Sequence, residues 1–188
     1  VKKMLNEKVG HTGTLDPMAT GVLPILIGNG TKCSKYLINH DKTYLVELTL
    51  GKKTSTADKE GKILEEIDVK KEILQENNVK QILKSFIGKQ EQVPPIYSAI
   101  KVNGKKLYEY ARNGEEVTLP TREINISSIE LLDYHDDLIK FKVTVAKGTY
   151  IRSLIEDIGK TLQTVDTMED LVRTKQGNYK IEDSYTLE

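Results

Sequence analysis

The sequence contains few of the residues that usually direct an assignment. Among its 188 residues there is one cysteine, Cys33, no tryptophan and only two phenylalanines. A single cysteine cannot form an internal disulfide bond, which fits a reducing compartment. No motif surrounds Cys33, so we interpret it as a small packed residue rather than as a nucleophile.

Long hydrophobic runs are also missing. No apolar stretch approaches the ~20 residues that a membrane-spanning helix needs, and no hydrophobic segment typical of a signal peptide follows Val1. The three histidines, His11, His40 and His135, lack the spacing of metal ligands. We therefore expect a cytoplasmic protein with no membrane partner and no metal site.

A nucleotide-binding loop is absent as well. The stretch Gly28-Asn29-Gly30-Thr31-Lys32 does not satisfy the P-loop pattern, so nucleotide hydrolysis is rejected. We expect Thr31 to cap a short helix that runs through Leu37.

The chain has no net charge, because 28 basic residues balance 28 acidic ones. The distribution is less even: residues 1–53 hold 8 Lys and Arg against 4 Asp and Glu, and residues 93–122 hold 5 against 3. Acidic residues prevail over 123–188, with 13 against 8. A one-sided binding face for an anionic partner and an ordinary solvated surface explain this imbalance equally well.

Hydrophobic periodicity predicts an α/β fold. Strict alternation over 43–50, in which Tyr44 begins the apolar face, predicts a half-buried strand, and segments 121–134 and 138–146 predict two more. Apolar residues at helical spacing predict an amphipathic helix over 78–88, capped by Asn78 and ended by Gly88.

The segment from Gly10 to Pro24 lacks both periodicities and is rich in glycine, proline and threonine. Such a segment is a shaped loop, where function concentrates. Asp16 is its only acid, and an Asx turn or a helix cap is the ordinary explanation for it. The apolar run 22–27 that follows predicts a buried strand.

A second informative region lies between Gln92 and Gly114. Asn103-Gly104 predicts a tight turn between an extended stretch, 96–102, and a short helix. Residues 97–114 carry four basic side chains against one acid, with three tyrosines among them. Basic groups that contact phosphate and aromatic rings that stack on unpaired bases suit a folded RNA loop, although basic hairpins are common.

Arg152 stands in the first turn of a predicted helix that follows Gly148. Its charge there opposes the helix dipole, so helix stability does not explain it. A carboxylate partner and an exposed surface position both remain open.

The run Gly10-His11-Thr12-Gly13-Thr14-Leu15-Asp16-Pro17, followed by Ala19-Thr20-Gly21-Val22-Leu23, resembles the signature of the TruB family of tRNA pseudouridine-55 synthases. Five more segments resemble the family: Lys42-Thr43-Tyr44, the loop from Lys53 to Gly61, the stretch from Pro95 to Arg112, Gly148-Thr149-Tyr150-Ile151-Arg152, and Leu171-Val172-Arg173-Thr174-Lys175. The resemblance extends over about residues 8–188.

The resemblance implies a mixed, largely antiparallel sheet flanked by helices, with an inserted RNA-binding arm at about 93–122. It also implies that residues 1–188 form a catalytic domain without the family's first strand and C-terminal PUA-type domain. The expected activity is isomerisation of uridine 55 in the T-loop of tRNA, after that base is flipped out, by a monomeric protein without a cofactor. The expected partner is the T-arm stem-loop.

The resemblance also implies roles for single residues. Asp16, Tyr44 and Arg152 would be catalytic, with the arginine against the aspartate. Contacts to the RNA or the target nucleotide would come from His11, Thr14, Leu15, Tyr97, Lys101, Lys105, Lys106, Tyr110, Arg112, Leu171 and Arg173. This chain departs from the family at Val172, where a second arginine is usual, and in the acidic segment 164–170.

Two other functions stay open. One is a non-catalytic tRNA-binding or folding factor of the same fold, and the other is a scaffolding protein that binds no RNA. The sequence also leaves open whether Asp16 attacks C1′ of the sugar, attacks C6 of the base or assists formation of a glycal.

Overall fold

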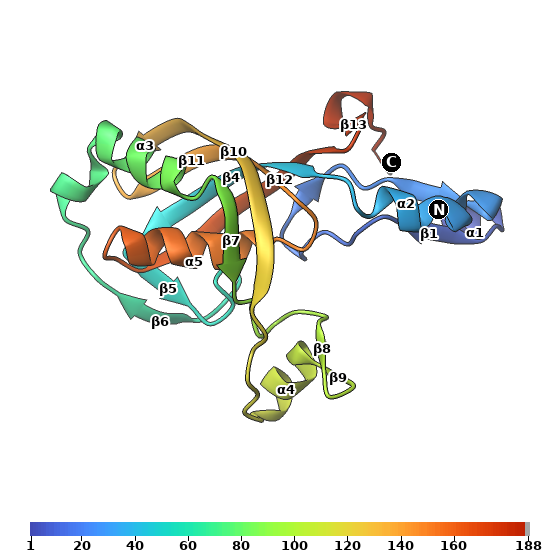
Figure 1. The fold of residues 1–188 in the computed structure, drawn as a ribbon, viewed down its shortest axis with the longest axis horizontal. Coiled ribbons are helices and arrows are strands. Elements are labelled where there is room, and N and C mark those ends of the chain that lie inside the picture. The colour runs from blue at the N-terminus through green and yellow to red at the C-terminus, as the bar shows by residue number, and fades with distance from the viewer. Residues whose placement is uncertain (187–188) are drawn as a thin grey trace.

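The computed structural model describes residues 1–186, and its centre is a seven-stranded sheet. The strand order is β13-β12-β4-β11-β10-β7, with β2 beside β12 (Figure 1). The bounds are β2 Thr20–Gly21, β4 Lys42–Leu50, β7 Gly88–Gln92, β10 Arg122–His135, β11 Leu138–Val145, β12 Asp166–Gln176 and β13 Tyr179–Lys180. Only β2 and β12 pair in parallel among these strands, so the predicted mixed, largely antiparallel sheet is confirmed.

The core lies between this sheet and two helices, α3 (Glu76–Ser85) and α5 (Ile151–Thr161), which contact each other. The alternation along the central strands explains the arrangement. Tyr44, Val46 and Leu48 of β4 are buried, whereas Glu47 on the other face forms an ion pair with Lys140 of β11. One face of the sheet is therefore packed against helices and the other is partly open to solvent.

The predicted helix over 78–88 exists, but its ends are different. It begins at Glu76 and ends at Ser85, so Asn78 lies inside the first turn, where its side-chain amide donates to the carbonyl of Ile73 at 2.9 Å. Gly88 does not end the helix but starts β7, with a φ of +113°. The expected strands 43–50, 121–134 and 138–146 agree with β4, β10 and β11 to within one residue.

A projection formed by residues 1–11 and 25–37 extends to the right in Figure 1. Its elements are α1 (Lys2–Leu5), β1 (Val9–His11), β3 (Ile25–Ile27), η1 (Gly28–Cys33) and α2 (Ser34–Leu37). The prediction of a buried strand at 22–27 is wrong, because the side chains of Ile25 and Ile27 are 39% and 45% exposed on a two-stranded sheet. Thr31 does not cap a helix either; its hydroxyl donates to the carbonyl of Gly28 within η1.

The inserted segment 93–121 forms a separate arm below the sheet in Figure 1. It consists of β8 (Lys101–Val102), β9 (Lys105–Lys106) and α4 (Leu107–Asn113). The turn predicted at Asn103-Gly104 is present, with φ of +51° and +81°, as a two-residue hairpin of type I′ requires. Of the stretch expected to be extended, only Lys101–Val102 forms a strand. The remaining elements are β5 (Lys52–Thr54), β6 (Ile63–Glu66), η2 (Lys71–Leu74) and η3 (Ile181–Asp183).

Gly21 of β2 lies against the backbone of β12, and we expect its replacement by alanine to be strongly destabilising. Its φ is +105°, and an added Cβ would lie 2.2 Å from the carbonyl oxygen of Arg173. The two strands would have to separate, so the free energy of unfolding should fall by about 3 kcal/mol. Urea unfolding measures the loss. Gly30→Ala is the control, because no heavy atom lies within 4 Å of its added Cβ. Equal midpoints for the two variants would contradict this packing.

Asp166, the first residue of β12, makes stability depend on pH. Its side chain is buried, its Oδ2 has no hydrogen-bond partner in the described part of the chain, and burial, with a smaller contribution from Glu156, raises its pKa to about 8. In the unfolded chain an aspartate titrates near pH ~3.9. Between these values the folded state holds a proton that the unfolded state has lost, so stability falls as pH rises.

We therefore expect the free energy of unfolding to decrease from about pH 4 to pH 8 by on the order of 1.4 kcal/mol per pH unit from this group. Asp166→Asn should remove most of that slope, since an amide does not titrate. Chemical unfolding at a series of pH values measures it, with Asp68→Asn, an exposed carboxylate, as the control. An unchanged slope in Asp166→Asn would show that Asp166 is ionised in the folded state.

Candidate active site

The loop that carries Asp16 is fixed to strand β12 by buried hydrogen bonds. Arg173 donates from Nε to the carbonyl of Val22 at 2.7 Å and from Nη2 to the carbonyl of Gly13 at 3.1 Å. The side-chain amide of Gln176 donates to the carbonyl and hydroxyl oxygens of Thr12 at 3.1 and 2.7 Å. Both ends of the loop are thus held by one strand, which fixes where Asp16 stands.

This arrangement corrects the expectation for Arg173. The resemblance implied a contact between Arg173 and RNA, but its side chain is 1% exposed and two of its nitrogens are bonded to loop carbonyls. A guanidinium with five donors is suited to holding several backbone oxygens at once. In this structure Arg173 therefore positions the loop from inside.

Asp16 and Arg152 form an ion pair, with 3.0 Å between Oδ2 and Nε. The carboxylate partner expected for Arg152 is therefore present, and the arginine is not an exposed surface residue, since it is 7% exposed. The negative charge of Asp16 offsets the unfavourable position of the guanidinium at the start of α5. Asp16 itself is partly open, with a third of its side chain accessible.

Arg152 has two further acceptors, which come from different parts of the chain. Its Nη1 donates to the carbonyl of Thr56 at 3.4 Å, and its Nη2 donates to the carbonyl of Tyr97 at 3.2 Å. Tyr97 lies near the start of the inserted arm. The guanidinium therefore joins the loop of Asp16, the segment after β5 and the base of the arm.

Asp16 opens into a cavity of about 110 Å³. This is the room of three to four water molecules at ~30 Å³ each, a size that suits one small ring. Its walls are Thr14, Leu15, Asp16, Ala19, Tyr44, Thr149, Tyr150, Ile151 and Leu171. Five residues singled out from the sequence, namely Thr14, Leu15, Asp16, Tyr44 and Leu171, thus surround one space.

Tyr44 and Leu171 form buried parts of this cavity, at 8% and 3% exposure. Burial raises the pKa of the Tyr44 phenol, and the charge of Asp16 adds to this, although Arg173 opposes it. Tyr44 therefore stays protonated at neutral pH, so it offers an aromatic face and a hydroxyl donor rather than a phenolate base.

The other predicted contacts lie outside the cavity. His11 is exposed on β1, and its Nδ1 accepts from the amide of Gly13 at 3.4 Å. The basic residues of the arm are on a separate unit, and two of them have partners there. Lys105 pairs with Glu115 at 2.6 Å, and Lys106 donates to the hydroxyl of Tyr108 at 3.1 Å.

The remaining arm residues differ in exposure: one is bonded within the arm and the others are accessible to solvent. The hydroxyl of Tyr110 donates to the carbonyl of Val102 at 3.0 Å, so it stabilises the arm itself. Lys101 and Arg112 are exposed, and 39% of Tyr97 is accessible.

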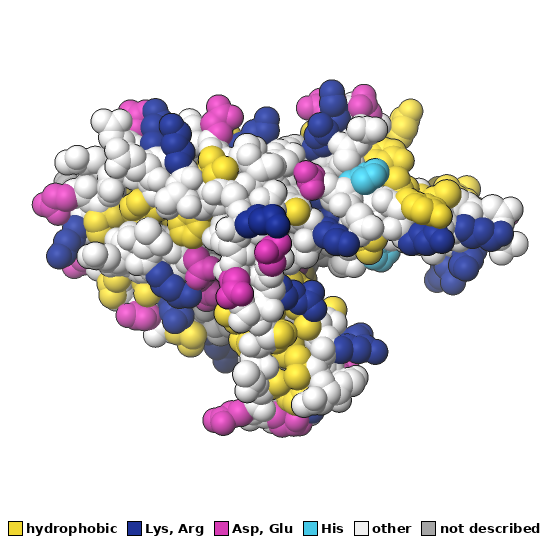
Figure 2. All heavy atoms as spheres, viewed as in Figure 1, with side chains coloured by type: hydrophobic (Ala, Val, Ile, Leu, Met, Phe, Trp, Pro, Cys, Tyr) yellow, Lys and Arg dark blue, Asp and Glu magenta, His cyan; other side chains and the backbone are white. Residues whose placement is uncertain are grey.

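Exposed basic side chains gather on the two units that project from the sheet. Figure 2 shows Lys and Arg along the projection of residues 1–11 and 25–37 and on the side of the arm that faces it. The exposed lysines of the projection are Lys2, Lys3, Lys8, Lys32 and Lys35. An anionic partner that reached the Asp16 cavity between these units would meet positive charge on both sides.

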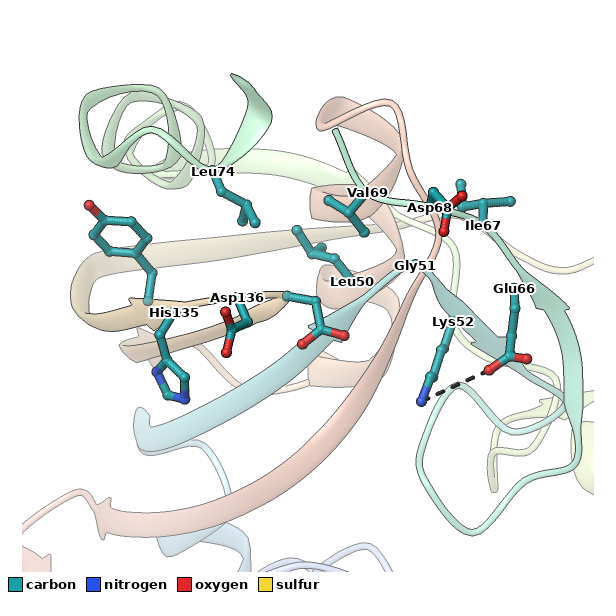
Figure 3. A pocket seen from close by; sticks show the side chains of 12 residues that line it. Leu50, Gly51, Lys52, Glu66, Ile67, Asp68, Val69, Leu74, His135 and Asp136 are labelled. Atoms are coloured by element: carbon teal, nitrogen blue, oxygen red, sulfur yellow. Dashed lines mark ion pairs between the residues drawn. The ribbon is translucent and has the colours of Figure 1, made fainter. Parts of the chain in front are cut away.

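A much larger hollow lies elsewhere, at the far end of β4 and the β10–β11 turn (Figure 3). Its volume is about 920 Å³, and its lining includes four carboxylates, Glu66, Asp68, Asp136 and Asp137. One of them, Glu66, pairs with Lys52 at 3.9 Å. Its negative charge would repel an anionic partner, so its size alone does not make this hollow the site of such a partner.

Two kinds of site are not seen in residues 1–186. None of the helices there has the length and apolar composition needed to cross a bilayer. No group of three or more histidine, cysteine, aspartate or glutamate side chains in that range is arranged to hold a metal ion.

Three residues that hold the site together were not predicted from the sequence. Thr12, Gln176 and Gln92 are polar and almost fully buried, which composition and periodicity do not reveal. Gln92 had one signal: it stands directly before a stretch with two prolines, where a strand must end.

The chain is similar to known proteins over nearly its whole length. Residues 2–151 match the family model described as TruB family pseudouridylate synthase (N terminal domain). The chain is 50% identical over 186 residues to tRNA pseudouridine synthase B of Clostridium kluyveri, and 51% identical over 182 residues to that of Clostridium tetani. Each alignment covers 97% of this chain but 62% of the relative, so this chain spans less than two thirds of their length.

Solved structures show the same similarity. A chain of a Cbf5-Nop10-Gar1 complex matches with a TM-score of 0.71 and 32% identity, over 95% of this chain and 44% of that chain. A chain of an H/ACA RNP bound to a substrate RNA containing 2′-deoxyuridine matches with a TM-score of 0.66 and 29% identity, over 95% and 42%.

Proposed function

The chain belongs to the TruB family of pseudouridylate synthases, and on that premise we propose that it converts one uridine of a folded tRNA to pseudouridine. The observation that carries the proposal is the Asp16–Arg152 ion pair at the wall of a cavity the size of one small ring. Relatives about half identical to this chain are named tRNA pseudouridine synthase B, which supports tRNA as the substrate. The target we propose is uridine 55 in the T-loop.

The reaction breaks the bond from C1′ to N1 of the uracil and forms a bond from C1′ to C5. The proton on C5 leaves, and N1 gains one, so no oxidant, reductant or group donor is consumed. An ionised carboxylate at the reacting ring can act as a nucleophile or stabilise a developing positive charge on the sugar. We assign this role to Asp16, which Arg152 holds in one orientation.

The other walls of the cavity suit a flipped base. A uridine inside folded RNA is inaccessible, so it has to leave the stack before it can reach Asp16. The ring of Tyr44 provides an aromatic face for the extruded uracil, and Leu171 provides apolar contact. The neutral phenol of Tyr44 can also donate a hydrogen bond to a base oxygen.

The RNA would lie between the arm and the projection of residues 1–11 and 25–37. We propose that Lys101 and Arg112, exposed on the arm, contact its phosphates, with Tyr97 available for stacking. His11, exposed at the start of the Asp16 loop, would contact the RNA close to the flipped nucleotide. We further propose, from the family resemblance, that residues 1–188 are a catalytic domain that acts as a monomer on the T-arm, in the cytoplasm.

Nucleoside analysis tests the function. An unmodified tRNA transcript is incubated with the chain and digested, and we expect a single pseudouridine per transcript. A transcript in which cytidine replaces uridine 55 should gain no pseudouridine. Tight binding without pseudouridine would favour a non-catalytic tRNA-folding factor, and a filter assay without binding would favour a scaffolding protein.

A further inference from the structure

The segment that precedes the arm is fastened to the wall of the cavity by one side chain. Gln92 is the last residue of β7, and it is 3% exposed. Its Nε2 donates to the carbonyl of Tyr150 at 3.0 Å, and its Oε1 accepts from the backbone amide of Tyr150 at 2.8 Å. We propose that Gln92 is a positioning residue, which sets the arm in register with the catalytic carboxylate; this inference rests on the proposed function.

Gln92 marks the root of the arm. In the sheet Gln92 is paired with Arg122, so the chain leaves the sheet after Gln92 and returns to it at Arg122. The next residue, Val93, is also held, because its carbonyl accepts from the hydroxyl of Ser153 at 2.7 Å. Both contacts go to the start of α5, and together they set the direction in which the arm departs.

We call the two hydrogen bonds between the side chain of Gln92 and the backbone of Tyr150 the Gln92 clamp. Its Tyr150 side is part of the candidate active site. Tyr150 lines the cavity and is the residue that precedes α5, yet it provides no side-chain cap for that helix. Gln92 instead fixes both backbone polar groups of Tyr150 from another element. Arg152, which binds Asp16, follows two residues later. The clamp therefore fixes the backbone position from which the Arg152 side chain extends toward Asp16.

A second link runs in parallel. Arg152 donates to the carbonyl of Tyr97, inside the arm, as well as to Asp16. The arm and Asp16 therefore meet through one short stretch, 150–152, that Gln92 holds in place. An arm that binds RNA but is not fixed to this stretch would present the target nucleotide out of register with Asp16, and misplacement by about 1 Å can cost about 100-fold in rate.

Four proteins test the proposal: wild type, Gln92→Ala, Gln92→Glu and Gln90→Ala. Gln90 is the matched control, because it lies on the same strand and also donates from its amide to a backbone carbonyl, that of Phe86 at the end of α3. The measurements are kcat and the RNA dissociation constant for a T-arm stem-loop, at a temperature where circular dichroism shows every variant folded. Hydrogen exchange of the Tyr150 amide is measured without RNA.

We expect Gln92→Ala to lower kcat at least tenfold, to leave the RNA dissociation constant within threefold and to speed exchange of the Tyr150 amide. Gln90→Ala should match wild type in all three. Gln92→Glu gives a sharper readout, since a protonated carboxyl is similar in shape to the amide and restores the donor toward Tyr150. Burial raises the pKa of such a carboxyl, so its activity relative to wild type should rise as the pH is lowered.

A wild-type kcat in Gln92→Ala would overturn the proposal. A decrease in kcat that is equally large in Gln92→Ala and Gln90→Ala would also overturn it. A relative activity of Gln92→Glu that does not change with pH would also count against it. If wild type forms no pseudouridine, the proposed function fails on its own account. The clamp is then judged by exchange alone, and an unchanged Tyr150 amide in Gln92→Ala would overturn it.

Discussion

Replacement of Asp16 by asparagine is expected to lower the rate of pseudouridine formation by on the order of 10⁴-fold or more. The amide has nearly the same shape as the carboxylate, but it is neither a nucleophile nor a negative charge beside a developing cation. Arg152 keeps its two backbone acceptors in the variant, so the loop should remain in place. The stem-loop dissociation constant should stay within a few-fold, since the charge lost is one that repels phosphate.

The rate is measured under single turnover, with enzyme in excess over RNA, so that slow product release does not hide the chemistry. Asp41→Asn, which removes an exposed acid just before β4, is the control and should turn over like wild type. Turnover by Asp16→Asn within tenfold of wild type would remove Asp16 from the reaction.

The second large effect is expected at Arg152. Arg152→Lys keeps the positive charge, but an ammonium group does not have the planar fork with which the guanidinium reaches Asp16, Thr56 and Tyr97. We expect kcat to fall by about 100-fold in Arg152→Lys and further in Arg152→Met, because Asp16 is then free to rotate. Each unsatisfied carbonyl also costs on the order of 1–3 kcal/mol of folding stability.

Lys160→Met is the matched control, since Lys160 lies on the same helix and its ion pair with Asp157 at 2.9 Å is on the surface. It should leave kcat unchanged and stability within ~1 kcal/mol. An Arg152→Lys variant with wild-type kcat would show that charge alone matters and that the three-way contact does not.

The sequence was informative where one physical pattern dominated. Strict alternation placed β4 and β11 within one residue, because a sheet with one packed face requires it. The position of Arg152 at the start of a helix left both a carboxylate partner and an exposed position open, and the structure shows the partner. That this partner is Asp16, 136 residues away, came from the resemblance, since nothing local links the two.

The failures concern burial that depends on distant parts of the chain. The run 22–27 is apolar, yet Ile25 and Ile27 are exposed because their two-stranded sheet has no covering layer in the described residues. Arg173 has a side chain that usually lies at the surface, but two buried carbonyls from a loop about 150 residues earlier bind it inside. The Gln92 clamp likewise joins two segments that no local pattern connects.

The most direct test of the central claim is release of tritium from a T-arm stem-loop labelled at C5 of its uridines. Formation of the new bond from C1′ to C5 expels the label at the target position only. We predict that wild type releases the label of a single uridine per RNA and that a stem-loop with cytidine at that position releases none. Absence of release from an RNA that the chain binds would contradict the assignment of the Asp16 cavity as a uridine-isomerising site.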